Sequence, residues 1–467
     1  MRNNSKGANR ITKLPQFAIK FSNGVFLLAV FFSILIAIFI FYKAFKTYYV
    51  YNYDIFILFS VIFAILFGIG LRLSNDLKVN FSLLLCSVVI TIYTFEIYLE
   101  FVTSKTQSEE KIVKQLGVPF DSRTIMEVIK NLNETGVSAY SSFIPKTIKR
   151  LNGLSSINGR IYPLGGIPNV ITVNCNELGY WSIYESDKYG FNNPKGLYKK
   201  NKVDIMLVGD SMTEGSCVNS DASMSAVLRE LGFNAISIGK NGNGPLIELA
   251  SIKEYAEPLE PKIVLWLYYV NDITDLIGEM GSPLLRKYLE EDNYTQNLIS
   301  REGEIEEALK NYDWEQLKIE NPTVMTRVQK IGNRLIRIFK LVNLRSNLNF
   351  FPKHNPAIFK KILKKSRKMV SGWGGELYFV YLPSYSRYYT GNEHINRESV
   401  LRTATELDIP IIDIHREGFA HHTDPLSLFP FKHYKQSHYN VYGYRLVAEL
   451  IGKRLEKDGI NPINSNN

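Results

Sequence analysis

The sequence predicts an α/β domain with a parallel sheet, preceded by an anchor of three transmembrane helices. From residue 201 onward, short β-rich apolar runs alternate with helical patterns, which is typical of parallel strands covered on both faces. Before residue 103, three stretches each approach the roughly 20 apolar residues that cross the hydrocarbon core as a helix. With 45% apolar and 21% charged residues, the 467-residue chain can form a sizeable core, and wholesale disorder is not expected.

The three apolar stretches open the chain, and we assign residues 1–102 to a tail and three spans. The stretches are Val25–Tyr42, about 55–71 and about 81–101, with Glu96 near the end of the third. A cleaved signal peptide would explain one such stretch but not three in a row. The pattern therefore indicates a multi-pass membrane anchor.

The distribution of Lys and Arg predicts the orientation of these spans. The tail before the first span has no acidic residue and five basic ones: Arg2, Lys6, Arg10, Lys13 and Lys20. Such a tail favours a cytoplasmic N-terminus. Three crossings then place everything after Phe101 outside the cytoplasm, unless one segment is shallow or re-entrant. Residues that flank the membrane contribute to the net charge of +10, and we expect no nucleic-acid partner.

Two regions are expected beyond the anchor. For residues 103–200 we expect a linker, with a helix around 122–132, and then a small β-rich lead-in. We expect the α/β domain to span residues 201–467. Its strands are expected at Val203–Gly209, Phe233–Gly239, Lys262–Tyr269, Glu376–Pro383 and Ile409–Ile414.

A long helical insertion, about 280–370, separates the third and fourth expected strands. From Thr323 to Val370 there are thirteen Lys and Arg residues and no Asp or Glu. Apolar residues recur there at helical spacing, with basic residues on another face, which predicts a basic amphipathic helix. Such a helix either packs on the domain with a solvated basic face, or contacts anionic lipid headgroups or an anionic substrate.

The chain has three cysteines, and only two of them lie in the soluble part. Cys86 falls in an apolar stretch. Cys175 and Cys217 form a disulfide in one interpretation, which requires an extracytoplasmic domain, and stay unpaired in the other. No Cys/His spacing indicates a zinc site, and we expect neither a metal nor a cofactor.

A GDSMTEG string, Gly209–Gly215, directly follows the first predicted strand. Ser211 lies where the strand ends and a helix begins. Such a turn exposes the hydroxyl, and the helix N-terminus favours negative charge that develops nearby. A serine at this place is also a common N-cap, so its position alone does not indicate catalysis.

Three further strings come later in the chain. IGKNGNGP, Ile238–Pro245, follows the second predicted strand, and YYVNDI, Tyr268–Ile273, ends the third. SHYNVYGYRLVAELI, Ser437–Ile451, opens the last predicted helix. A turn with glycines, or a single histidine, is more often structural than catalytic, so the order of the four strings is the informative feature.

In this order the four strings resemble the blocks of the SGNH/GDSL hydrolases. The resemblance implies a three-layer, flavodoxin-like sandwich in which Ser211 is the nucleophile and His438 the base. It implies that the oxyanion receives the backbone N–H groups of Ser211 and Gly242, with Gly244 the less favoured alternative. It also implies that Asn271 supplies a side-chain N–H to the same oxyanion.

The sequence departs from the family pattern at two places within the region of resemblance, about 203–455. Tyr269 replaces the usual glycine before the asparagine block. Lys435 stands where the family carries an Asp three residues before the histidine, and a lysine cannot accept the imidazole N–H. We expect Asp424, in preference to Asp413, to orient His438. A Ser–His dyad remains open beside them.

The resemblance implies ester chemistry through an acyl-enzyme on Ser211. Similarity to membrane-tethered SGNH proteins of bacterial envelope-polysaccharide pathways favours an esterase or O-acyltransferase. Its expected partners are the lipid bilayer and an acylated extracytoplasmic glycan or lipid-linked glycan. One alternative is a lipase or thioesterase at the membrane surface. Another is a non-catalytic binding protein on an eroded fold, since a fold alone supports many functions.

Overall fold

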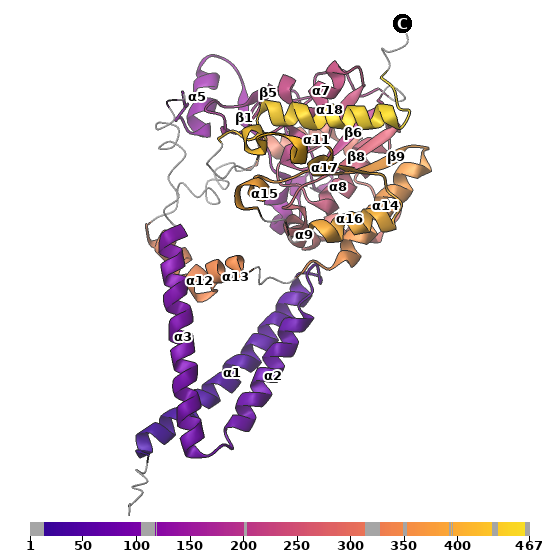
Figure 1. Cartoon of the computed structure of the whole chain (residues 1–467). Coiled ribbons are helices and arrows are strands. Elements are labelled where there is room, and N and C mark those ends of the chain that lie inside the picture. Colours follow the sequence, from indigo (N-terminus) through magenta and orange to yellow (C-terminus); the bar gives the residue numbers. More distant parts are fainter. Residues whose placement is uncertain are drawn as a thin grey trace, which may run out of the picture. The chain divides into compact units, whose positions relative to one another are not determined.

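The structure, a computed structural model, describes residues 14–103, 117, 119–199, 203–312, 327–348, 353–391, 394, 396–431 and 438–462. The chain divides into two compact units, drawn in Figure 1. The first unit combines the N-terminal helices with residues 325–353 of the insertion, and the second contains the sheets. The insertion, expected as part of the α/β domain, is thus shared between both units.

Apolar helices make up most of the first unit. They are α1 (Gln16–Lys46), α2 (Asp54–Gly70) and α3 (Asn75–Thr103), joined by α12 (Arg327–Phe339) and α13 (Val342–Asn347) from the insertion. Among the described residues, α1 and α3 are long and apolar enough to cross a membrane, whereas α2 has 17 residues. The sequence predicted three spans, and the structure shows two helices of spanning length.

A five-stranded parallel sheet forms the centre of the second unit. The strands are β6 (Ile205–Gly209), β7 (Ala235–Ser237), β8 (Ile263–Tyr268), β9 (Glu376–Tyr381) and β10 (Ile411–Asp413). Their order in the sheet is β10-β9-β8-β6-β7, and every neighbouring pair is parallel. This is the flavodoxin-like order, whose direction reverses between β6 and β8. Loops that leave the carboxyl ends of these two strands diverge there and leave room for a site.

Helices cover both faces of this sheet. On one face, Leu207, Leu265 and Val380 pack into a core with side chains of α7 (Met224–Glu230) and α18 (Val441–Lys457). On the other face, Phe359 of α14 (Pro356–Gly372) packs against the rings of Tyr268 and Phe379. Figure 1 shows α18, in yellow, beside α7, and α14 beside α8 (Pro245–Ser251) and α16 (Arg397–Glu406). The described residues therefore form the expected three layers.

Short helices follow or connect the strands of this unit. They are α5 (Ile125–Glu134), α6 (Ser211–Glu214), α9 (Asp272–Met280), α10 (Pro283–Glu290), α11 (Glu302–Lys310), α15 (Tyr385–Thr390) and α17 (Ile414–Glu417). The helix expected around 122–132 is α5, which begins with a capping box in which Thr124 and Glu127 exchange hydrogen bonds.

The lead-in folds onto the same unit as two small sheets. In one, β1 (Ala139–Ser141) pairs in parallel with β4 (Ile171–Val173), which pairs antiparallel with β5 (Ile183–Glu185). In the other, β2 (Leu154–Ser156) and β3 (Gly159–Ile161) form a hairpin. A 3-10 helix, Pro145–Leu151, connects them. This region and the parallel sheet belong to the same compact unit.

Candidate active site

The turn that carries Ser211 is held tightly at the carboxyl end of β6. A side chain at Gly209 would collide with Thr213 and with the carbonyl oxygen of Leu267, so only glycine fits there. Asp210 then caps α6 by accepting a hydrogen bond from the N–H of Met212 at 2.9 Å. Ser211 follows as the first residue of α6 and is 7% exposed. Its Oγ lies 3.5 Å from Oδ2 of Asp210.

His438 belongs to the last of the four blocks and contacts the lead-in. Its Nδ1 forms an ion pair with Oε1 of Glu177 at 3.0 Å, and its backbone N–H donates to Oε2 of the same carboxylate at 3.3 Å. Both side chains are largely buried. Because the carboxylate accepts from Nδ1, the imidazole keeps Nε2 as its basic nitrogen. This is the arrangement that a general base requires.

Elements of the α/β domain fix the backbone that follows His438. Tyr439 is buried, and its hydroxyl donates to the carbonyl of Pro383 after β9. Asn440 caps α18 by accepting from the N–H groups of Tyr442 and Gly443. These contacts anchor the residues that follow His438, while Glu177 holds the histidine itself.

The electrostatics around His438 favour its charged form. Burial by itself lowers the pKa of this imidazole, but the adjacent Glu177 carboxylate, helped by Asp210 and Glu214, raises the pKa above its ordinary value. The interaction with Asp210 is mutual, since His438 also lowers the pKa of that carboxyl against the dominant effect of burial, which raises it. His438 is therefore within electrostatic reach of the residue next to Ser211.

Glu177 corrects the expectation for the acid of the triad. The sequence favoured Asp424, but Nδ1 of His438 faces Glu177 from the lead-in. Asp424 precedes a 3-10 turn and its backbone N–H donates to His422. Asp413 caps α17 and forms an ion pair with Arg397. The open dyad is not what the structure shows, and Lys435, which raised the question, lies outside the described residues.

A disulfide links the segment that carries Glu177 to the segment that follows Ser211. Cys175 and Cys217 are bonded, with their Cα atoms 4.9 Å apart. Sγ of Cys217 also lies 3.6 Å from Nδ1 of His438. The three side chains of Glu177, Cys217 and His438 converge closely enough to suggest metal ligands. Because the sulfur of Cys217 is in a disulfide, it offers no thiolate, and we interpret the cluster as an acid–base pair.

The expected oxyanion donors lie in the loops after β7 and β8. Gly242 has a positive φ of 73°, and a Cβ there would collide with the side chain of Lys146. Any other residue at this position would be strained and would displace the lysine. The N–H of Gly244, the less favoured alternative, donates to Glu279 at 2.5 Å. The backbone N–H of Gly244 is thereby engaged, which favours Gly242 as the donor.

Asn271 follows β8 and is held by two carboxylates. Its Nδ2 donates to Oδ2 of Asp275 at 2.9 Å, and its side chain also hydrogen-bonds Asp210. Asp275 in turn forms an ion pair with Lys146 at 3.3 Å. The unusual Tyr269 is accommodated because its ring packs in the core and its N–H donates to Asp272. Asn271 must exchange one carboxylate for the substrate oxygen in order to serve the oxyanion.

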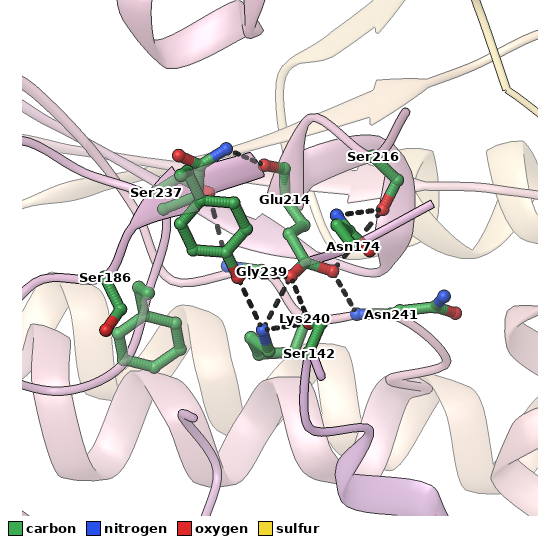
Figure 2. A network of polar contacts seen from close by, with 12 residues as sticks. Ser142, Asn174, Ser186, Glu214, Ser216, Ser237, Gly239, Lys240 and Asn241 are labelled. Atoms are coloured by element: carbon green, nitrogen blue, oxygen red, sulfur yellow. Dashed lines mark hydrogen bonds and ion pairs between the residues drawn. The ribbon is translucent and has the colours of Figure 1, made fainter. Parts of the chain in front are cut away.

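A buried ion pair connects the serine block, the glycine loop and the lead-in (Figure 2). Lys240, two residues before Gly242, donates to Oε1 of Glu214 at 2.6 Å, and both side chains are fully buried. The same carboxylate oxygen accepts from Ser142 at 3.0 Å and from Tyr184 at 2.9 Å, both of the lead-in.

The other oxygen of Glu214 holds the glycine loop directly. Oε2 accepts from the backbone N–H of Asn241 at 2.9 Å, one residue before Gly242. Burial raises the pKa of Glu214, but Lys240 and the other donors lower it below its ordinary value overall. The carboxylate is therefore ionised and fixes the loop on which the expected oxyanion donor lies.

Reasoning from the sequence named Ser211, Gly242, Asn271 and His438 as site residues, and it gave no role to four residues that the lead-in contributes, namely Glu177, Ser142, Tyr184 and Lys146. One signal could have found the acid. Glu177 is two residues from Cys175, so a commitment to the Cys175–Cys217 disulfide would have placed a carboxylate beside the serine block.

Comparison with known proteins finds no matching protein-family model and no match among curated proteins. Among solved structures, a lipase/acylhydrolase from Enterococcus faecalis aligns over 56% of this chain and 100% of its own, with 13% identity and a TM-score of 0.31. The acetyl xylan esterase AlAXEase aligns over 54% and 100%, with 13% identity and a TM-score of 0.31.

A two-domain esterase, CEX, active on acetylated mannans, is a third solved structure with similarity to the chain. It aligns over 55% of this chain and 49% of its own, with 14% identity and a TM-score of 0.30. Values this low carry no weight for function, which the geometry of the site has to support.

Proposed function

We propose that this chain is a membrane-anchored serine esterase or O-acyltransferase of the SGNH type. The observation that carries the proposal is the pair of His438 and Glu177, which lies beside Cys217, six residues after Ser211, with His438 within electrostatic reach of Asp210. A histidine whose Nδ1 is held by a carboxylate, beside a serine at a strand-to-helix turn, is the arrangement that activates a hydroxyl.

The reaction follows from these groups. Nε2 of His438 takes the proton of Ser211 as Oγ attacks the acyl carbonyl of an ester, and Glu177 stabilises the imidazolium. The N–H groups of Ser211 and Gly242 and the amide of Asn271 receive the oxyanion. Collapse breaks the ester bond, and His438 returns the proton to the leaving alcohol. The acyl group stays on Ser211 until water or a second hydroxyl accepts it.

The proposed substrate is an acylated glycan or lipid-linked glycan outside the cytoplasm. Several features support this setting: the apolar helices α1 and α3, the basic tail before α1 and a disulfide, which persists in oxidising compartments. A phosphatase reporter fused after Ser104 is expected to be active, and a reporter that needs the cytoplasm is expected to be silent. The reverse pattern would contradict the extracytoplasmic placement.

A fluorophosphonate probe tests the chemistry directly, because only an activated serine reacts well with it. The full chain in detergent should be labelled at Ser211, and Ser371→Ala, which removes an exposed hydroxyl on α14, should be labelled equally well. Absence of labelling would favour a non-catalytic binding protein. Incubation with short acyl esters, with and without glycan acceptors, then separates hydrolysis from transfer by the product formed.

A further inference from the structure

Lys146, in the 3-10 helix Pro145–Leu151 of the lead-in, lies beside both loops that carry the expected oxyanion donors. On one side, a Cβ at Gly242 would lie 2.7 Å from Nζ of Lys146, so the ammonium packs against the glycine itself. On the other side, Nζ forms an ion pair with Oδ1 of Asp275 at 3.3 Å. Oδ2 of the same carboxylate accepts from Nδ2 of Asn271 at 2.9 Å. One cation thus contacts Gly242 directly and reaches Asn271 through Asp275.

The side-chain amide of Asn271 is fully engaged by carboxylates in this arrangement. An asparagine amide has two N–H groups to donate. One goes to Asp275, and the amide also donates to Asp210, whose pKa this hydrogen bond lowers. Asn271 can therefore serve an oxyanion only after it has released one of the two carboxylates.

Asp275 is the carboxylate that the amide can leave at the smaller cost. The side chain of Asp275 is 12% exposed, and its ion pair with Lys146 remains when the amide turns away. Asp210 is fully buried, and its other partners are the neutral N–H of Met212 and the more distant hydroxyl of Ser211. A buried carboxylate that loses a hydrogen bond is destabilised less when a cation still pairs with it.

Lys146 also compensates the charge behind the expected donors. The tetrahedral intermediate carries a negative oxygen that forms next to those donors. An unpaired carboxylate at Asp275 would repel that oxygen, and it would retain the amide of Asn271 more strongly. The ion pair with Lys146 removes both effects, because it neutralises Asp275 at the side of the loop where Gly242 lies.

We propose that Lys146 is a positioning residue of the oxyanion site. Its ammonium retains Asp275 while the amide of Asn271 turns from that carboxylate to the oxyanion beside Gly242. The inference deepens the proposed function and rests on it, since it concerns the same acyl transfer on Ser211. The lead-in then controls the strength of the oxyanion site as well as the orientation of the base.

Steady-state kinetics of the full chain in detergent, with a short acyl ester, test this role. Lys146→Met keeps an unbranched side chain of similar length and removes its charge. It should lower kcat about 10- to 100-fold, less than the roughly 10²–10³ that loss of a donor itself costs. KM should stay within about twofold, because the neutral carbonyl of the bound ester carries no oxyanion. An unchanged kcat, or a loss confined to KM, would overturn the inference.

A second background tests whether Lys146 acts through Asp275. In Asp275→Asn no carboxylate retains the amide, so Lys146→Met should then lower kcat by less than about threefold. The two variants of this comparison contain no carboxylate that has lost its cation, so neither is destabilised in that way. A tenfold or larger loss in this background would show that the lysine does not work through Asp275 and would overturn the inference.

Phenylboronic acid reports on the oxyanion site without turnover. Oγ of Ser211 forms a bond to boron and its proton passes to His438, which gives an anionic tetrahedral adduct that resembles the intermediate. The affinity for the boronic acid should fall in Lys146→Met by about the same factor as kcat/KM, as expected for an analogue of the transition state. An unchanged affinity would overturn the inference.

Lys149 provides the matched control. It lies one turn further along the same 3-10 helix, and its side chain packs against Gly278 of α9. Lys149→Met removes the same charge and should leave kcat unchanged. A parent chain that neither cleaves the ester nor binds the boronic acid would overturn the proposed function, and this inference with it. A parent chain that does both, with Lys146→Met behaving like Lys149→Met, would overturn this inference alone.

Discussion

Two regions of the second unit meet at Ser211, and they contribute different parts of the site. The loops after β6, β7 and β8 bring the proposed nucleophile and the expected oxyanion donors, all at the carboxyl end of one sheet. The lead-in brings the carboxylate that holds His438 and the polar groups that surround Glu214. The sheet thus supplies the groups that we propose contact the substrate, and the lead-in supplies groups that hydrogen-bond to residues of the site.

This difference shows that position along a chain is a poor guide to position in a site. Groups at strand ends are placed by the strands themselves, so each depends on its own short stretch of sequence. Glu177 depends instead on a contact with a residue 261 positions away and on the disulfide to Cys217. The first kind of placement survives many changes elsewhere, whereas the second fails if one long-range link fails.

The largest effect is expected from the sheet itself. Ser211→Ala should lower esterase turnover by about 10⁴ or more, because removal of the nucleophile leaves only the donors and binding. Turnover of a short acyl ester measures this, with circular dichroism as a check on the fold. Comparable turnover in the variant would show that another residue is the nucleophile. The comparison of the two regions would then not concern the active site.

The next effect tests the lead-in. Glu177→Gln should lower turnover by about 10³ to 10⁴, because the histidine loses the group that fixes its tautomer and stabilises its charge. Asp424→Asn is the matched control and should cost less than about tenfold. A larger loss of turnover in Asp424→Asn than in Glu177→Gln would show that Asp424 is the acid. The lead-in would then contribute only to stability.

The same variant carries a signature in pH. The base must be neutral, so activity rises with pH through the pKa of His438. Glu177 raises that pKa against the lowering effect of burial, so Glu177→Gln should move the acidic limb of the rate profile to lower pH. An unchanged acidic limb would mean that Glu177 does not act on the catalytic base.

A smaller effect concerns the ion pair that joins the two regions. Lys240→Met leaves the fully buried Glu214 without its cation, which should cost about 3–5 kcal/mol in the free energy of unfolding. Adding Glu214→Leu should recover part of this loss, because the uncompensated charge is gone. Lys360→Met, which breaks the exposed pair with Glu406, should cost less than about 1 kcal/mol. Denaturant unfolding measures the free energy of unfolding of all these variants. A similar loss for both lysine variants would show that the buried pair does not stabilise the fold more than an exposed pair.

The smallest effect concerns the covalent link between the two regions. The double variant Cys175→Ser with Cys217→Ser removes a cross-link between residues 42 positions apart. It should lower the free energy of unfolding by about 2–4 kcal/mol. The loss of turnover should be smaller than for Glu177→Gln, since the carboxylate is retained. Cys86→Ser serves as the control and should change neither. A larger loss of turnover than in Glu177→Gln would show that the disulfide, and not the carboxylate, dominates the geometry.

The parallel sheet and its strand positions could be predicted from the sequence, because apolar runs and the blocks beside them are local signals. Each expected strand appears within two residues at its N-terminal side, as in Val203–Gly209 against β6 (Ile205–Gly209). The candidate acid could not be predicted from the sequence, because no local pattern distinguishes Glu177 from the other glutamates of the chain. The segment 327–348 illustrates the same limit, since its helical period predicted α12 but not the carboxylates of α3 that hold it.

The separation of Glu177 and His438 along the chain has a consequence for the order of synthesis. They are 261 residues apart, so at roughly 5–20 residues per second the histidine emerges about 13 to 52 seconds after the glutamate. Cys217 follows Cys175 by only 42 residues, so at the same rates it emerges within about 2 to 8 seconds. The serine block and the acid can therefore be joined early, as a prepared half of the site, while the base arrives with the last helix. In a nascent chain, the proposed nucleophile therefore has no base until almost the whole chain has been made.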